Sequence, residues 1–139
     1  MQLKDSSLLC SSCLIGGAWA GSDNGETFAV LNKTTGAEIC RVPNCGKAET
    51  ERAIAAADKA FKSWAAMTAK ARGAVLHTWH DLIHANIDDL ALLLTLEQGK
   101  PLAESKGEIL LGATFIDWFA EEGRRAYGEV IPVPWPGKQ

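Results

Sequence analysis

The sequence lacks the features that mark several large classes of protein. No apolar run approaches the ~18 residues that a membrane-spanning helix needs. The net charge is −3, so the composition gives no basic excess for binding nucleic acid. Internal repeats and low-complexity runs are missing as well. We therefore expect neither a nucleic acid nor a membrane among the partners of this chain.

Short catalytic and cofactor motifs are also missing. The chain has no G-x-G-x-x-G or P-loop string for phosphate groups, no H-E-x-x-H helix for zinc and no G-x-S-x-G turn for a nucleophile. Its hydrophobic fraction of 47% is nevertheless enough for a core, and 139 residues suit roughly one domain of ~100–200 residues.

The cysteines form two close pairs, Cys10 with Cys13 and Cys40 with Cys45. Two thiolates at such spacing can share a zinc ion, but the four-residue gap of the second pair departs from a ribbon-type site. Cysteine also packs as a small apolar residue, and Cys40 lies in an alternating stretch. We favour reduced structural thiols and keep a small zinc module as the alternative.

The start of the chain imitates a secretion signal. Lys4, an apolar run and Ala18-Trp19-Ala20 resemble its charged start, its apolar region and its cleavage site. Asp5 spoils the positive start, and Gly16-Gly17 interrupts the apolar run. We therefore predict a cytoplasmic protein whose residues 1–12 form a loose lead-in.

The strands are expected early in the chain. Residues 14–20 read as one short strand, and residues 27–32 and 37–42 read as two more. The turn residues 33–36 end in glycine, so the last two strands form a hairpin.

Helical periodicity then takes over. Residues 48–67 predict an amphipathic helix, and Thr68 is a suitable N-cap for the next helix. We expect the apolar residues of that second helix to point inward: Val75, Leu76, Trp79, Ile83 and Ile87. A break near Asn86 precedes a third helix over residues 87–98.

Gly99 and Pro101 separate the third helix from a fourth, predicted from Pro101 to about Tyr127. Its apolar stripe comprises Leu102, Ile109, Ala113, Ile116, Ala120, Gly123 and Tyr127. Further apolar residues widen the stripe to most of the circumference: Leu111, Phe115, Trp118 and Phe119. A helix this apolar belongs inside a larger body.

Three histidines, His77, His80 and His84, lie on one side of the second helix at i, i+3 and i+7. Imidazoles at this spacing can bind zinc. The same side carries Gly73 and adjoins Asp88, so we interpret it as a solvated face and keep the metal site as the alternative.

Two segments carry a family resemblance. TLEQGKPLAESKGEI (residues 95–109) and FIDWFAEEGRRAYGE (residues 115–129) resemble the amino-terminal region of aldehyde dehydrogenases, and within that superfamily bacterial succinate-semialdehyde dehydrogenases. The likeness runs from about residue 14 to 131. It implies an α/β fold in which residues 1–139 form an incomplete amino-terminal part of the cofactor-binding domain. This part is mainly α-helical, with strands within about 14–42, including a short antiparallel hairpin, and helices within about 48–127.

The resemblance also implies a reaction. In the family a cysteine thiolate attacks an aldehyde, hydride passes to NAD or NADP, and a glutamate activates the water that releases the acid. All these groups lie downstream of the part matched here, so none of the four cysteines is expected to be catalytic. The implied function is the amino-terminal portion of a homo-oligomeric enzyme that oxidises succinate semialdehyde, with no cofactor bound by this chain alone.

Two candidate sites follow from the same resemblance. Some family members hold a monovalent cation with main-chain carbonyls and a carboxylate, at positions that match Val30, Leu31 and Glu97; alternatively, Glu97 only caps or pairs at a helix end. The fourth helix borders the substrate tunnel of the family, which implies aldehyde contacts for four residues: Phe115, Trp118, Phe119 and Glu122. The alternative for the three aromatic residues is an ordinary place in a core.

Two other classes of function stay open. The chain would act as a stand-alone helical interaction or structural protein if a partner or a second copy covered its apolar faces. The cysteines give the other class, the small zinc module.

Overall fold

The computed structural model describes residues 2–129 and residue 136. Its elements in chain order are a 3-10 helix η1 (Ser6–Leu8), the strands β1 (Cys13–Ile15), β2 (Ala18–Ala20), β3 (Thr27–Leu31) and β4 (Glu38–Pro43), and the helices α1 (Lys47–Ala66), α2 (Ala69–Ala85), α3 (Ile87–Gln98) and α4 (Leu102–Glu122). The expected mainly helical piece with antiparallel strands near its start is confirmed. Except for Pro136, the proline-rich tail lies outside the described residues.

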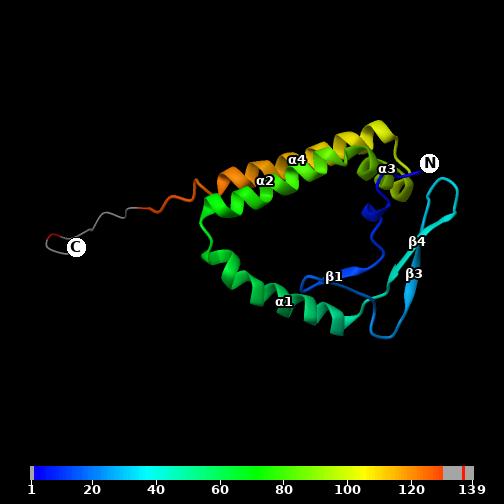
Figure 1. The fold of residues 1–139 in the computed structure, drawn as a ribbon, viewed down its shortest axis with the longest axis horizontal. Helices are drawn as coiled ribbons and strands as arrows, with labels where there is room; N and C mark the ends of the chain where they lie inside the picture. Colours follow the sequence, from blue (N-terminus) through cyan, green and yellow to red (C-terminus); the bar gives the residue numbers. More distant parts are fainter. Residues whose placement is uncertain (1, 130–135, 137–139) are drawn as a thin grey trace.

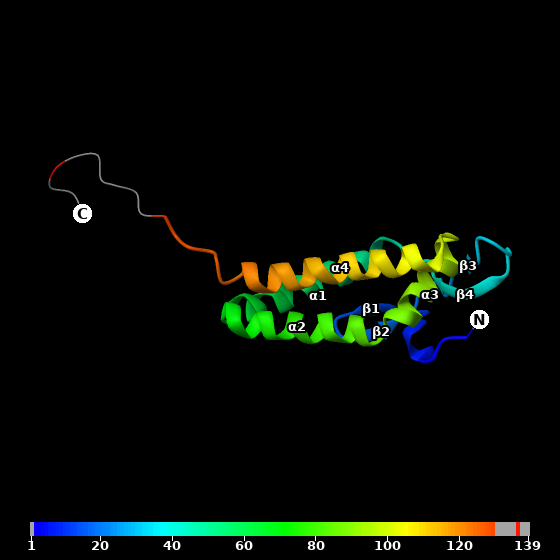
Figure 2. The same cartoon turned by 90° about the horizontal axis from the view of Figure 1, so that it is seen from above.

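The helices α2 and α4 lie side by side and run in opposite directions, with α3 across one end of the pair (Figures 1 and 2). Helix α1 lies apart from this pair and packs on β1 instead (Figure 1). The β3–β4 hairpin stands beside α3, at the far end from the α1–α2 connection (Figure 1). We call α2, α3 and α4 the helical cluster.

The strands form two separate antiparallel hairpins. Strands β3 and β4 pair as predicted, with a bulge between Val30 and Leu31. The prediction of one strand over residues 14–20 is wrong, because β1 and β2 pair with each other in the register Cys13 to Ala20. Gly16 and Gly17 have φ values of 60° and 84°, and these left-handed conformations, easy for glycine, reverse the chain there.

The connection between α1 and α2 uses the predicted cap. The Thr68 hydroxyl accepts a hydrogen bond from the Ala71 amide at 3.2 Å, which satisfies one of the free N–H groups of the first turn. On α1, the large apolar residues Ile54 and Phe61 are each 64% exposed. The apolar face of α1 therefore contributes little to the described fold.

The contact between α2 and α4 is made by small residues. A Cβ on Gly73 would lie 3.1 Å from the carbonyl oxygen of Ala120, so the two backbones approach closely. Ala113 and Ala120 are almost fully buried. The predicted inward face of α2 is wrong for Val75 and Trp79, which are exposed, because the opposite face with Gly73 packs on α4.

The turn between α3 and α4 matches its sequence signal. Gly99 caps α3 with a φ of 81°, and its amide donates to the Thr95 carbonyl at 2.8 Å. Pro101 is the residue before the first turn of α4. The hydroxyls of Thr95 and the buried Ser105 share a hydrogen bond of 2.8 Å, which joins the two helices.

Helix α4 ends at Glu122, so the prediction that it continues to Tyr127 is wrong. The amides of Arg124 and Arg125 donate to the carbonyls of Glu121 and Glu122 in turns rather than continuing the helix. Tyr127 therefore lies outside the helix and is exposed.

The predicted loose lead-in is instead anchored on α3. The buried carboxylate of Asp89 accepts from the backbone amides of Lys4 at 3.0 Å and Asp5 at 2.8 Å. Beside it, Asp88 pairs with the ammonium groups of Lys4 and Lys106. Contacts over more than eighty positions in sequence give no local signal, so sequence reasoning missed them.

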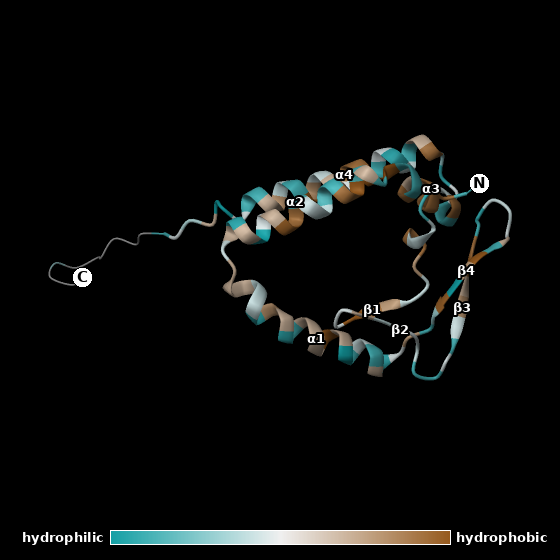
Figure 3. Ribbon diagram, viewed as in Figure 1, coloured by the Kyte–Doolittle hydropathy of each residue, from teal (hydrophilic) through white to brown (hydrophobic). Residues whose placement is uncertain are grey.

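Apolar segments recur along α1, α2 and α4 (Figure 3). Many of their large side chains are exposed, including Trp79, Leu111 and Phe115. Even so, among the described residues no helix is both long enough and apolar enough to cross a membrane.

Candidate functional site

Helix α4 presents an exposed aromatic face. Phe115, Trp118 and Phe119 are exposed by 57%, 61% and 62%, and Leu111 continues the same face by one turn. We call these four residues the aromatic face of α4. Within the described residues the core contact of α4 is made by its small residues, so the alternative that the three aromatics lie in a core stays open for a longer fold.

Glu122, the fourth residue of the predicted substrate tunnel, lies one turn beyond Phe119 and is half-buried. Its carboxylate pairs with Arg125 at 3.8 Å. The structure therefore brings all four predicted tunnel residues onto the last three turns of α4. Their contact with an aldehyde stays a prediction.

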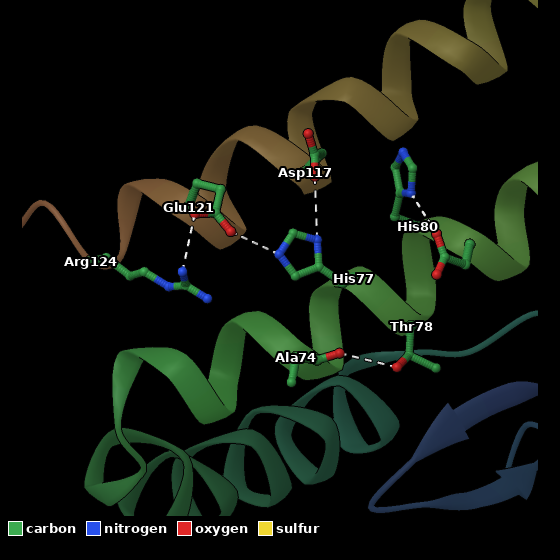
Figure 4. A network of polar contacts seen from close by, with 8 residues as sticks. Ala74, His77, Thr78, His80, Asp117, Glu121 and Arg124 are labelled. Atoms are coloured by element: carbon green, nitrogen blue, oxygen red, sulfur yellow. Dashed lines mark hydrogen bonds and ion pairs between the residues drawn. The ribbon is translucent and has the colours of Figure 1, made fainter.

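A polar network links α2 to the last turns of α4 (Figure 4). His77 lies between two carboxylates of α4, with Nε2 2.9 Å from Glu121 and Nδ1 3.3 Å from Asp117. Arg124 pairs with Glu121 at 3.5 Å and extends the network.

This network corrects the interpretation of the histidine side of α2 as a solvated face for Gly73 and His77, whereas His84 is exposed as expected. His77 and Gly73 face α4. His80 and His84 contact each other, with ring centroids 4.4 Å apart, and His80 also contacts Asp81 (Figure 4). Within residues 2–129, no three His, Cys, Asp or Glu side chains gather in a way that could hold a metal ion.

The residues of the predicted cation site lie where the end of α3 contacts β3. The amide of Lys33, in the turn after Leu31, donates to the carbonyl of Leu96 at 3.2 Å. Burial raises the pKa of the Cys40 thiol, and the nearby charge of Glu97 adds to this effect. Since Cys40 pairs with Val30 across the hairpin, Val30, Leu31 and Glu97 belong to one region, and their binding of an ion stays a prediction.

The buried carboxylate of Glu49 joins the first hairpin to α1. It accepts from the Asp23 amide at 2.6 Å and from the Gly46 amide at 2.9 Å. These backbone hydrogen bonds, that of Asp23 first, lower the pKa of Glu49. Arg52 clamps the Asp23 carboxylate with two contacts of 2.7 Å. We call this arrangement the Glu49 junction.

Two cysteines lie against the Glu49 junction. The Sγ atoms of Cys13 and Cys45 are 3.6 Å apart, and all four cysteines are free thiols. The hydrogen bond with Cys13, followed by burial, raises the pKa of Cys45. The sequence pairing of Cys10 with Cys13 and of Cys40 with Cys45 therefore does not describe the contacts in the fold.

Comparison with known proteins identifies the class. Residues 19–139 match the Aldehyde dehydrogenase family, and the chain belongs to that family. It is 55% identical over 139 residues to a glutarate-semialdehyde dehydrogenase of Pseudomonas putida, with 100% of this chain and 29% of that protein covered.

Two further relatives are semialdehyde dehydrogenases as well. A succinate-semialdehyde dehydrogenase [NADP(+)] of Escherichia coli is 51% identical over 132 residues, 95% of this chain and 27% of that protein. The crystal structure of succinate-semialdehyde dehydrogenase from Burkholderia pseudomallei superposes with a TM-score of 0.94 at 53% identity, covering 96% of this chain and 28% of that one. The chain thus spans less than a third of the length of these relatives.

Proposed function

We propose that this chain is the amino-terminal portion of an NAD- or NADP-dependent aldehyde dehydrogenase, and that it forms part of a cofactor-binding domain completed by residues that lie outside it. The supporting observation is the aromatic face of α4. Three aromatic side chains, each more than half exposed, are costly to leave in water. A chain that matches 29% of a relative's length has this face available for the remainder of such an enzyme.

The proposed substrate is the semialdehyde of a short dicarboxylic acid, and specifically succinate semialdehyde. Similarity to the Escherichia coli and Burkholderia pseudomallei proteins supports this choice. Glutarate semialdehyde is the second candidate, favoured by the 55% identity to the Pseudomonas putida protein. The two acids differ by one methylene, which a hydrophobic pocket separates by only ~1–3 kcal/mol.

The chemistry in this proposal belongs to groups outside the chain. When bound, the nicotinamide accepts the hydride that the aldehyde carbon loses. The residues described here would supply a wall: the aromatic face would exclude water from the aldehyde, and Glu122 would lie at its edge. A cytoplasmic location and a homo-oligomeric assembly are part of the same proposal.

A chimera tests the proposal directly. In it, this chain replaces the matching amino-terminal 27% of the Escherichia coli enzyme, which supplies the remaining residues. We expect the chimera to reduce NADP with succinate semialdehyde, and the isolated chain to show no turnover. Turnover by the isolated chain, or a folded but inactive chimera, would contradict the proposal and favour a stand-alone interaction protein.

The tunnel is tested in the same chimera. We expect Trp118→Ala to raise KM for the aldehyde severalfold, because the substitution removes a large apolar wall. Trp79→Ala is the matched control, since Trp79 is similarly exposed, at 55% against 61%, but lies on α2. Equal effects of the two substitutions on KM would remove Trp118 from the proposed tunnel.

The proposed cation site has a separate readout. Carbonyl oxygens and one carboxylate suit a hard cation, so we expect Glu97→Gln to weaken any dependence of chimera activity on potassium or sodium. Glu104→Gln, in the first turn of α4, is the control. An unchanged response of Glu97→Gln to both ions would leave Glu97 as a residue that only caps or pairs at the end of α3.

A further inference from the structure

The Cys13 and Cys45 thiols touch across two segments that are far apart in sequence. Their Sγ atoms are 3.6 Å apart and the residues are separated by 32 positions. A disulfide has an S–S distance of ~2.05 Å, so the two sulfurs need to approach by only about 1.5 Å. Within residues 2–129, this is the one thiol–thiol contact.

Each of the two cysteines is held in place by its own anchor. Cys13 pairs with Ala20 in the β1–β2 hairpin. Cys45 precedes Gly46, whose amide donates to the buried Glu49 carboxylate at 2.9 Å. The same carboxylate fixes the Asp23 amide, just after the hairpin. Because these contacts hold both segments independently of the sulfurs, the thiols meet through the fold and not through local sequence.

Both thiols are also within reach of small molecules. Cys13 and Cys45 are half-buried, whereas Cys10 is exposed and its thiol contacts the Ser7 carbonyl. A half-buried pair whose sulfurs already touch, and that adjoins no third metal-binding side chain among the described residues, suits a disulfide better than a metal site.

We propose that Cys13 and Cys45 form a reversible disulfide site, oxidised by a low-molecular-weight disulfide such as oxidised glutathione. One cysteine thiolate attacks the glutathione disulfide and releases one glutathione thiol, leaving a mixed disulfide. The second cysteine thiolate then attacks the cysteine sulfur of that mixed disulfide and releases the second glutathione thiol. The two cysteines lose two electrons, the glutathione disulfide gains them, and the two thiol protons pass to the released glutathiones.

The product would tie the first hairpin covalently to the start of α1. The closed loop would contain all four strands, β1 to β4, so the bond would fix the strand region at the Glu49 junction. Excess reduced glutathione would reverse the reaction, which makes the site responsive to the redox balance of its surroundings.

Tryptic peptides make the test specific. Cleavage after Lys4, Lys33, Arg41 and Lys47 places Cys40 in peptide 34–41 and Cys45 in peptide 42–47, while Cys10 and Cys13 share peptide 5–33. The purified chain is incubated with oxidised glutathione, its remaining thiols are alkylated, and the peptides are analysed by mass spectrometry. We expect peptide 5–33 linked to peptide 42–47 as the main oxidised product.

Matched variants identify the sulfurs. Cys13→Ser should abolish the linked peptide, and Cys10→Ser should leave its yield unchanged. The urea-unfolded chain is the reference: short loops close more readily there, so pairs of Cys10 with Cys13 and of Cys40 with Cys45 should dominate. The same peptide analysis of the chimera tests whether Cys13 and Cys45 form the disulfide in a completed fold, and it does not depend on enzyme activity.

Two results would overturn the proposal. In the first, the folded protein forms the pairs Cys10 with Cys13 and Cys40 with Cys45, as the urea-unfolded chain does, both as the isolated chain and within the chimera. The other is a chimera in which Cys13 and Cys45 remain alkylatable while Cys10 becomes glutathionylated, since accessible oxidant would then have reached the protein without joining the pair.

Discussion

The helical cluster and the Glu49 junction are held together by different kinds of contact. In the cluster, small residues bring backbones close, as where Gly73 meets Ala120. At the junction, one buried carboxylate accepts from two backbone amides, and Arg52 clamps Asp23. In both regions several large apolar side chains nearby stay exposed, although Leu92 of α3 belongs to the buried core.

This difference shows how the apolar surface of the chain is used. Small residues and polar contacts fix the positions of the elements relative to one another, while large apolar groups such as Phe61 on α1 and Phe115 on α4 remain on the outside. Exposed apolar patches of this kind mark interaction surfaces. The described residues therefore resemble one part of a larger fold. If the observed contacts hold the helical cluster and the Glu49 junction together, removing those contacts should weaken each region separately.

The largest effect is expected at the backbone contact of the helical cluster. Gly73→Ala places a Cβ 3.1 Å from the Ala120 carbonyl oxygen, which the two helices can relieve only by separating. Gly107→Ala is the control, because a Cβ there meets nothing within 4 Å and alanine favours the helix. In urea unfolding followed by circular dichroism, we expect Gly73→Ala to be less stable than Gly107→Ala by ~1–3 kcal/mol. Equal stabilities would show that the close approach is not needed.

The Glu49 junction should respond to loss of its charge. Glu49→Gln keeps the shape of the side chain but replaces one carboxylate oxygen by a donor, so one of the amides of Asp23 and Gly46 loses its acceptor. We expect hydrogen exchange of these two amides to become about tenfold faster, with the amides of α2 unchanged. Glu51→Gln, on the exposed side of α1, is the control. Equal exchange in both variants would show that Glu49 does not hold the junction.

The same carboxylate gives the junction a dependence on pH. The pKa of Glu49 is lowered in the folded state from an ordinary value of 4.5. Its contribution to stability is therefore present above that value and is lost as the pH falls through the lower, folded-state pKa. Relative to the intrinsic exchange rate at each pH, acid should reduce the protection of the Asp23 and Gly46 amides in the native chain but have less effect in Glu49→Gln.

The sequence predicts these regions to different extents. Local signals were sufficient for the cap at Thr68, the turn at Gly99 and the β3–β4 hairpin. The faces of α2 were assigned wrongly because periodicity shows which side of a helix is apolar but not which neighbour covers it. Trp79 was expected inside and is exposed, whereas Gly73 and His77 form the contact with α4.

In the candidate site, too, sequence patterns show the elements but not the contacts between them. Helical periodicity correctly placed Phe115, Trp118 and Phe119 on the fourth helix, but it did not show that they are exposed. The contact of Cys13 with Cys45 and the anchoring of Lys4 and Asp5 by Asp89 join residues distant in sequence. Such contacts depend on the path of the chain, which spacing within one segment does not reveal.

A smaller effect is expected at the connection between α1 and α2. Thr68→Ala removes the hydroxyl that accepts from the Ala71 amide at 3.2 Å, which should cost about 1 kcal/mol of unfolding free energy. Thr78→Ala is the matched control, since its hydroxyl only donates to the Ala74 carbonyl within α2 (Figure 4). If both substitutions have the same effect in urea unfolding, the cap does not stabilise the start of α2.

The smallest effect concerns the anchoring of the chain's start on the helical cluster. The ammonium groups of Lys106 and Lys4 lower the pKa of Asp88 from 3.8 to about 2. Because the folded-state pKa is depressed, the ion pairs stabilise the docked segment above about pH 4 and lose this effect as the pH falls from about 4 to about 2. Exposed pairs are weak and screened by salt, so we expect only a small, salt-sensitive shift in the docking of η1, measured by amide chemical shifts.

Asp88→Asn should abolish this titration while Asp81→Asn should preserve it, because Asp81 contacts His80 and neither lysine. An unchanged titration in Asp88→Asn would assign the acid sensitivity to another group and leave the buried Asp89 contacts as the anchor.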